Sequence, residues 1–286
     1  MGCREKPYSN FEIYRAMNQK VIVITGMHRS GTSLVANYLE KCNLNIGKEL
    51  LNPNSSKATS ESFAGHHEDM EFLDFHIDIL RRNRKNSSGL LIQNARSLSR
   101  NVWKVPLEMN ASDHRRAERL IESRSHIDQW GWKDPRTTLF LDFWEKTLED
   151  AYYILLFRKP LAVVESLIRR GFNEKLAKNK LNFLKSWSIY NLEIIKFKEK
   201  VGNRAFICDI DEVIQQPEAF LESIKTDFKL DLTPIDFSLL FSPKSFHASP
   251  SPQILEIKRN YPDEIQQAEA IYQDLKRLSS LAYVAV

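Results

Sequence analysis

The sequence predicts an α/β fold, a three-layer α/β/α domain with a central parallel sheet. Three apolar runs carry this prediction, at residues 21–25, 152–157 and 205–208, and each is followed by a segment with helical features. Continuous apolar runs rich in β-branched and aromatic residues are typical of strands that are buried on both faces, as in parallel sheets. Repetition of this strand-to-helix unit favours a doubly wound sheet.

The first unit begins with the run Val-Ile-Val-Ile-Thr at residues 21–25. After a short loop, apolar side chains recur at helical spacing, at Leu34, Val35, Tyr38, Leu39 and Cys42. The second run ends in Arg158-Lys159-Pro160, and the helical face that follows consists of Leu161, Val164, Leu167 and Ile168. The third run is followed by Pro217, a residue that suits the first turn of a helix.

We expect a single domain over residues 1–286, because a chain of this length with 42% hydrophobic residues can bury a sizeable core. Residues 52–101 are rich in Ser, Asn and charge, and a long insertion of this kind usually carries substrate specificity. Its one convincing helix is predicted at 68–80. Helical spacing of apolar residues predicts an amphipathic C-terminal helix within 262–281.

Composition excludes some classes of function. The 41 Lys and Arg against 37 Asp and Glu give a net charge of +4, which is too small for a nucleic-acid coat. The three cysteines lie far apart without metal-ligand spacing, which favours a reducing, cytoplasmic location. No apolar run approaches the roughly 20 residues of a membrane span, so we expect no stable membrane insertion. The oligomeric state has no signal in the sequence.

A glycine-containing loop, Gly-Met-His-Arg-Ser-Gly-Thr-Ser at 26–33, lies between the first strand and the first helix. In this context glycines let the backbone turn tightly, while loop N–H groups and the helix N-terminus face an anion. An ordinary turn is the alternative. If the loop binds phosphate, the binding residues are His28, Arg29, Ser30, Gly31, Thr32 and Ser33.

The loop differs from an ATP-binding loop at one position. The pattern GxxxxGK[ST] fits through Gly31 but has Thr32 where the lysine should be. A basic residue, Arg29, lies inside the loop instead, which suits a single 5′ phosphate-anhydride group better than a magnesium-bound triphosphate. A nucleotide kinase is therefore the weaker interpretation.

At these residues the chain resembles the sulfotransferase superfamily, in particular its bacterial-type branch, whose loop reads close to Gly-Met-His-Arg-Ser-Gly-Thr-Ser. The resemblance implies a P-loop-type domain and a donor, 3′-phosphoadenosine 5′-phosphosulfate (PAPS), which leaves as 3′-phosphoadenosine 5′-phosphate (PAP). Cytosolic members usually have lysine at the position of Arg29, so the arginine selects the branch.

The resemblance extends to a strand that ends in arginine and a following helix that bears a serine, here Arg158 and Ser166. In the superfamily these two residues hold the 3′-phosphate of the donor. Ser166 lies about two helical turns beyond Pro160, so both side chains can face one ligand. The alternative is a solvated strand end and a surface serine. The charges of Arg169 and Arg170 fit the C-terminal dipole of that helix.

The segment Lys133-Asp134-Pro135-Arg136 also resembles one found in bacterial-type sulfotransferases. Helix capping explains Asp134 and Pro135. Lys133 and Arg136 are candidate substrate-binding residues, pointing either at the donor or at an anionic acceptor, with solvated surface charges as the alternative.

For the catalytic base, the resemblance points to Glu68, which falls in a Gly-x-x-Glu-Asp pattern at 65–69. A carboxylate at a helix N-terminus is also explained by the dipole alone. His67 is the competing base, because histidine titrates near neutral pH. Adjacent histidines at 66 and 67 cannot face one metal ion, so we expect no metal.

Together these features predict in-line, metal-independent transfer of a sulfuryl group from PAPS to an acceptor hydroxyl or amine, with Arg29 neutralising charge. The acceptor is expected to be a small molecule or a glycan, and its identity has no signal in the sequence. The alternatives are a P-loop nucleotide kinase and a noncatalytic nucleotide-binding protein of the same fold.

Overall fold

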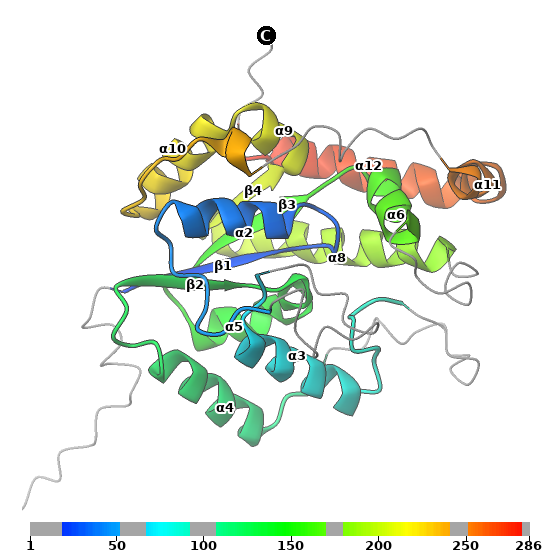
Figure 1. Ribbon diagram of the computed structural model, residues 1–286. Coiled ribbons are helices and arrows are strands. Elements are labelled where there is room, and N and C mark those ends of the chain that lie inside the picture. The colour runs from blue at the N-terminus through cyan, green and yellow to red at the C-terminus, as the bar shows by residue number, and fades with distance from the viewer. Residues whose placement is uncertain (1–18, 52–66, 92–106, 170–179, 241–250, 282–286) are drawn as a thin grey trace, which may run out of the picture.

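The computed structural model describes residues 19–51, 67–91, 107–169, 180–240 and 251–281. In these residues four parallel strands form a central sheet in the order β2-β1-β3-β4 (Figure 1). The strands are β1 (Lys20–Gly26), β2 (Gln129–Lys133), β3 (Tyr152–Phe157) and β4 (Ala205–Asp209). The predicted α/β fold with a central parallel sheet is confirmed.

Helices cover both faces of the sheet, which gives the three layers. The helices before β3 are α2 (Thr32–Lys41), α3 (Met70–Arg82), α4 (Ala111–Glu122) and α5 (Leu141–Thr147), with a 3₁₀ helix η1 at Pro135–Phe140. Those after β3 are α6 (Pro160–Arg169), α8 (Lys180–Val201), α9 (Ile210–Gln215), α10 (Pro217–Phe228), α11 (Pro252–Asn260) and α12 (Pro262–Leu278), with short 3₁₀ helices η2 (Gly202–Arg204) and η3 (Phe237–Leu239).

The alternation of side chains along each strand divides the core into two clusters. One cluster joins Ile22 and Ile24 of β1 to α2, α9 and α10, and the other joins Val21 and Val23 to the helices on the opposite face. In Figure 1, α2 and α10 lie on one side of the sheet and α3, α4 and α5 on the other. All six β3 residues except half-buried Tyr152 are buried, as expected for a sheet covered twice.

The strand order places a crevice where ligands bind in this class of fold. The chain leaves β1 for β2 on one side and returns to β3 on the other, so the order reverses between β1 and β3. In open α/β sheets, ligands bind outside the carboxyl ends of the strands at such a switch point. Gly26 and Leu156 are register partners near those ends, which puts the residues after them side by side.

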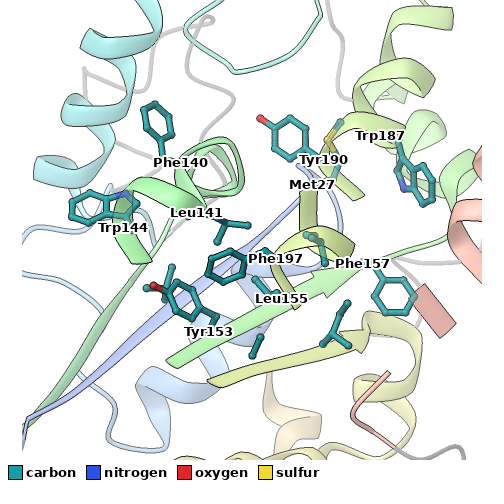
Figure 2. Packing of buried hydrophobic residues seen from close by; sticks show 14 of the residues in the cluster. Met27, Phe140, Leu141, Trp144, Tyr153, Leu155, Phe157, Trp187, Tyr190 and Phe197 are labelled. Atoms are coloured by element: carbon teal, nitrogen blue, oxygen red, sulfur yellow. The ribbon is translucent and has the colours of Figure 1, made fainter. Parts of the chain in front are cut away.

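Two aromatic residues of α8 belong to the hydrophobic core. Trp187 and Tyr190 are both buried, and Figure 2 shows them among the packed side chains of the larger cluster. They are core residues that also carry hydrogen bonds: the Trp187 indole donates to the Arg158 carbonyl at 3.0 Å.

No helix in the described ranges is long and apolar enough to cross a membrane.

Candidate active site

The loop between β1 and α2 has the backbone of an anion-binding turn. Arg29 and Gly31 adopt left-handed conformations, with φ of 69° and 84°. Gly31 is the N-cap of α2, and within the described chain no side chain caps this helix end. A Cβ on Gly31 would lie 2.2 Å from Ile210 Cγ1, so α9 also requires glycine here. The uncapped N-terminus of α2 leaves backbone N–H groups to bind an anion.

Arg29 meets the second predicted donor motif directly. Its Nε donates to Ser166 Oγ on α6 at 2.9 Å, and Arg158 Nη1 donates to the Arg29 carbonyl at 3.5 Å. The three residues come from the loop at 26–33, here called the phosphate loop after its expected ligand, from the end of β3 and from the middle of α6. The structure thus brings together side chains that are 137 positions apart in the sequence.

Arg158 lies in a half-buried position beside acidic groups. Burial lowers the pKa of its guanidinium, and the charges of Asp211 and of Asp209, the last residue of β4, act in the opposite direction. A guanidinium has no neutral form in proteins near pH 7, so Arg158 presents a fixed positive charge at the end of β3. That charge suits a phosphate group.

The small hydroxyl residues of the loop differ in their surroundings. Ser30 is buried, and its Oγ has no hydrogen-bond partner among the residues that the structure describes. Thr32 is buried in the first turn of α2, and the half-buried Ser33 accepts a hydrogen bond at 3.0 Å from Lys133 Nζ. Ser33 therefore connects the phosphate loop to β2.

Glu68 and Lys133 form a fully buried ion pair beside Ser33. Lys133 Nζ lies 2.5 Å from Glu68 Oε1, and both side chains have 0% exposure. Glu68 Oε2 is buried with no hydrogen-bond partner in the described part of the chain. Burial raises the pKa of Glu68 and lowers the pKa of Lys133, and the attraction between them opposes both shifts.

The start of α3 holds Glu68 in this position. Asp69 is the N-cap, since its carboxylate accepts from the N–H of Glu71 at 2.9 Å. The same carboxylate accepts from Arg124 Nη2 at 2.7 Å. One turn into the helix, Phe72 stacks on Trp132 of β2 with ring centroids 4.2 Å apart. Glu68 and Asp69 are adjacent acidic residues in the sequence, but in the structure Asp69 caps α3.

His67 points elsewhere. Its Nδ1 lies 3.3 Å from Glu40 Oε2, in the last turn of α2. Glu40 is seven residues beyond Ser33, about 10 Å along the helix. Of the two candidate bases, Glu68 is thus next to the phosphate loop and His67 is at the far end of α2.

Asp134 is the centre of a buried network that the sequence did not indicate. Its carboxylate accepts from Arg136 N and Nη1 at 3.0 Å and from His76 Nδ1 at 2.8 Å. Burial alone would raise the pKa of Asp134, but Arg136 and then His76 lower it well below its usual range. His76 Nε2 accepts from the Trp144 indole at 2.9 Å, so Nδ1 carries the proton.

Arg136 and His28 both contact the segment that follows α3. Arg136 Nε donates to the Ser87 carbonyl and His28 Nε2 contacts the Ser88 carbonyl, both at 2.7 Å. Both side chains are buried. The sequence expectation that Arg136 contacts substrate is untested, but its hydrogen bonds lie within the protein. The Nε2 atom of His28 is thus directed at the segment after α3.

Fold and site together define a three-layer α/β domain with two arginines and an uncapped helix N-terminus at the switch point of the sheet. The model of the sulfotransferase family matches residues 21–234, about three quarters of the chain. The chain therefore belongs to the sulfotransferase family.

The comparison with solved structures also finds sulfotransferases. Sulfotransferase STF9 from Mycobacterium avium has a TM-score of 0.50 at 14% identity, covering 96% of this chain and 80% of its own. The sulfotransferase domain of the Synechococcus PCC 7002 olefin synthase has a TM-score of 0.48 at 16% identity, covering 89% and 94%. No curated protein matches the sequence.

Proposed function

We propose that this protein transfers a sulfuryl group from PAPS to a hydroxyl or amine of a small-molecule or glycan acceptor. The observation that carries the proposal is the contact of Arg29 with Ser166 and Arg158 at the switch point of the sheet. The arrangement offers two cationic side chains and a hydroxyl at one edge, next to an uncapped helix N-terminus. A donor with phosphates at both the 3′ and 5′ positions matches two such anion sites.

In this proposal the two anion sites bind different phosphate groups of the donor. Arg158 and Ser166 hold the 3′-phosphate, and the loop N–H groups with Thr32 and Ser33 hold the 5′-phosphate. Arg29 neutralises charge on the sulfuryl oxygens once its guanidinium has left Ser166 Oγ. As the bond from sulfur to the 5′-phosphate oxygen breaks, negative charge grows on that oxygen and is stabilised by the α2 N-terminus.

Glu68 is proposed as the base. The acceptor oxygen forms the new bond to sulfur while its proton passes to the Glu68 carboxylate, and the products are the sulfated acceptor and PAP. Glu68 Oε2 has no hydrogen-bond partner within the described ranges, so this oxygen can accept the proton once the acceptor displaces the groups that bury it. Lys133, which touches both Glu68 and Ser33, links the base to the phosphate loop.

A kinase is less well supported, because Thr32 follows Gly31 where an ATP-binding loop has lysine, and the nearby Lys133 is paired with Glu68.

Nucleotide selectivity distinguishes the sulfotransferase proposal from a kinase. We expect PAP without metal to raise the melting temperature by about 5 °C at 100 times its Kd. ATP with magnesium should cause little change, and 5′-AMP, which lacks the 3′-phosphate, should act only weakly. Stabilisation by ATP with magnesium and none by PAP would reject the sulfotransferase proposal.

A further inference from the structure

Residues 86–91, which follow α3, are held by side chains from three different elements. Three consecutive carbonyls each contact one donor group: Ser87 with Arg136 Nε at 2.7 Å, Ser88 with His28 Nε2 at 2.7 Å and Gly89 with Tyr190 Oη at 3.1 Å. The donors come from η1, the phosphate loop and α8. The Leu91 N–H donates to Ser186 Oγ at 2.9 Å, also on α8. The backbone of 86–91 is therefore fixed at each of these positions.

The segment also has a local geometry of its own. Asn86 Oδ1 accepts from the N–H of Ser88 at 2.8 Å, which makes a tight turn. Gly89 has φ of 73°, and a Cβ there would lie 2.5 Å from Tyr190 Oη. Only glycine allows the Tyr190 hydroxyl to approach this backbone so closely. The turn and the close approach fit residues 86–91 to one conformation.

His28 is the link from the phosphate loop to this segment. A carbonyl only accepts hydrogen bonds, so Nε2 of His28 carries a proton and donates to Ser88. Burial first, and the charge of Arg136 second, lower the pKa of His28 to about 3. The ring is therefore neutral near pH 7, with its proton on Nε2, and the bond does not depend on protonation in that range.

The loop conformation that makes this bond is a strained one. The residue after His28 is Arg29, whose left-handed backbone costs about 1–2 kcal/mol for a residue other than glycine. A phosphate bound by the loop N–H groups stabilises that conformation, because the left-handed turn directs these N–H groups toward the anion. Donor binding thus favours the same loop geometry that places Nε2 against Ser88.

We propose that His28 is a positioning residue that couples occupancy of the donor site to the ordering of residues 86–91. The proposal rests on the proposed function, because it takes PAP or PAPS as the ligand of the loop. By linkage, an acceptor that requires the ordered segment binds more tightly to the donor complex, and the donor gains affinity by the same factor.

The test is hydrogen exchange of a peptide covering residues 86–91, measured with and without saturating PAP. In the parent protein we expect PAP to slow exchange about five- to tenfold, the lower part of the range for coupled sites. In His28→Leu, which keeps apolar bulk but has no donor, saturating PAP should leave the exchange rate unchanged. His28→Gln can place an amide N–H near the Nε2 position and should restore part of the effect.

Ser186→Ala is the matched control, because it removes the hydrogen bond of Leu91 without touching the phosphate loop. Exchange in this variant should be faster without ligand, yet PAP should still slow it. If PAP stabilises the parent in thermal melts but does not slow exchange at 86–91, or slows it equally in His28→Leu, the coupling is wrong. If PAP does not stabilise the parent at all, the proposed function fails with it.

Discussion

Glu68→Gln is expected to lower kcat for sulfuryl transfer by about 10²–10⁴-fold while leaving PAP binding intact. The amide keeps the size of the side chain and can still accept a hydrogen bond from Lys133, but it cannot take the proton of the acceptor. The measurement is transfer from sulfur-labelled PAPS to an acceptor found by screening hydroxylated compounds, together with PAP titration of the same variant.

The pH profile gives this prediction a second readout. Burial raises the pKa of Glu68, and a base must be deprotonated to work. The transfer rate of the parent should therefore fall as the pH drops through a value above the usual 4.3 or so of a glutamate. Glu68→Gln should lack this decline.

His67→Asn is the control for the base. Asparagine tolerates the left-handed backbone found at His67, with φ of 80°. Because His67 contacts Glu40 at the far end of α2, we expect the variant to keep the parent rate within about twofold. If His67→Asn loses transfer and Glu68→Gln retains it, then the base is His67.

Lys133→Met should destabilise the protein by about 3–5 kcal/mol, the usual cost of removing one partner of a buried ion pair. Glu68 would then be a buried carboxylate without its cation, since both side chains are fully buried. The free energy of unfolding is measured by urea denaturation. The double variant Glu68→Leu with Lys133→Met should recover most of the loss, because it removes the stranded charge. A double variant as unstable as Lys133→Met would contradict the assigned pairing.

The deficit of Lys133→Met should also depend on pH. The attraction of Lys133 lowers the pKa of Glu68, so its removal moves the folded-state pKa further above the unfolded value. A raised folded pKa contributes stability below the unfolded pKa, and that contribution is lost as the pH rises through the folded pKa. The variant should therefore be closest to the parent under acidic conditions and furthest from it near neutral pH.

The parts of the fold with strong local patterns could be predicted from the sequence. Strands β1, β3 and β4 coincide with apolar runs, and α3 and α12 with helical spacing. Strand β2 was not predicted, because it is only five residues long and contains Gly131, which weakens a strand signal. The glycine is explained by the neighbouring strand: a Cβ there would lie 2.0 Å from the Ile22 carbonyl oxygen.

The candidate site, like the fold, has parts that could be predicted from the sequence and parts that could not. The phosphate loop could be predicted because its residues are contiguous and lie between a strand and a helix. The Glu68 and Lys133 pair could not, because 65 positions separate the two and either charge alone is compatible with the surface. His76 was hidden among apolar neighbours in its helix. Its place between Phe75 and Ile79 is typical of an ordinary buried residue of an amphipathic helix. Its partner Asp134 was already explained by helix capping.

The most direct test of the account is a metal-free calorimetric titration of PAP into the parent, Arg158→Ala and Arg169→Ala. We expect tight binding by the parent and about 100-fold weaker binding by Arg158→Ala. This fold-change corresponds to the loss of a charge-assisted contact of about 3 kcal/mol. Arg169 is paired with Glu165 at the end of α6, so its variant should bind like the parent. Parent protein that is folded but does not bind PAP, or Arg158→Ala that binds it equally well, would contradict the donor site described above.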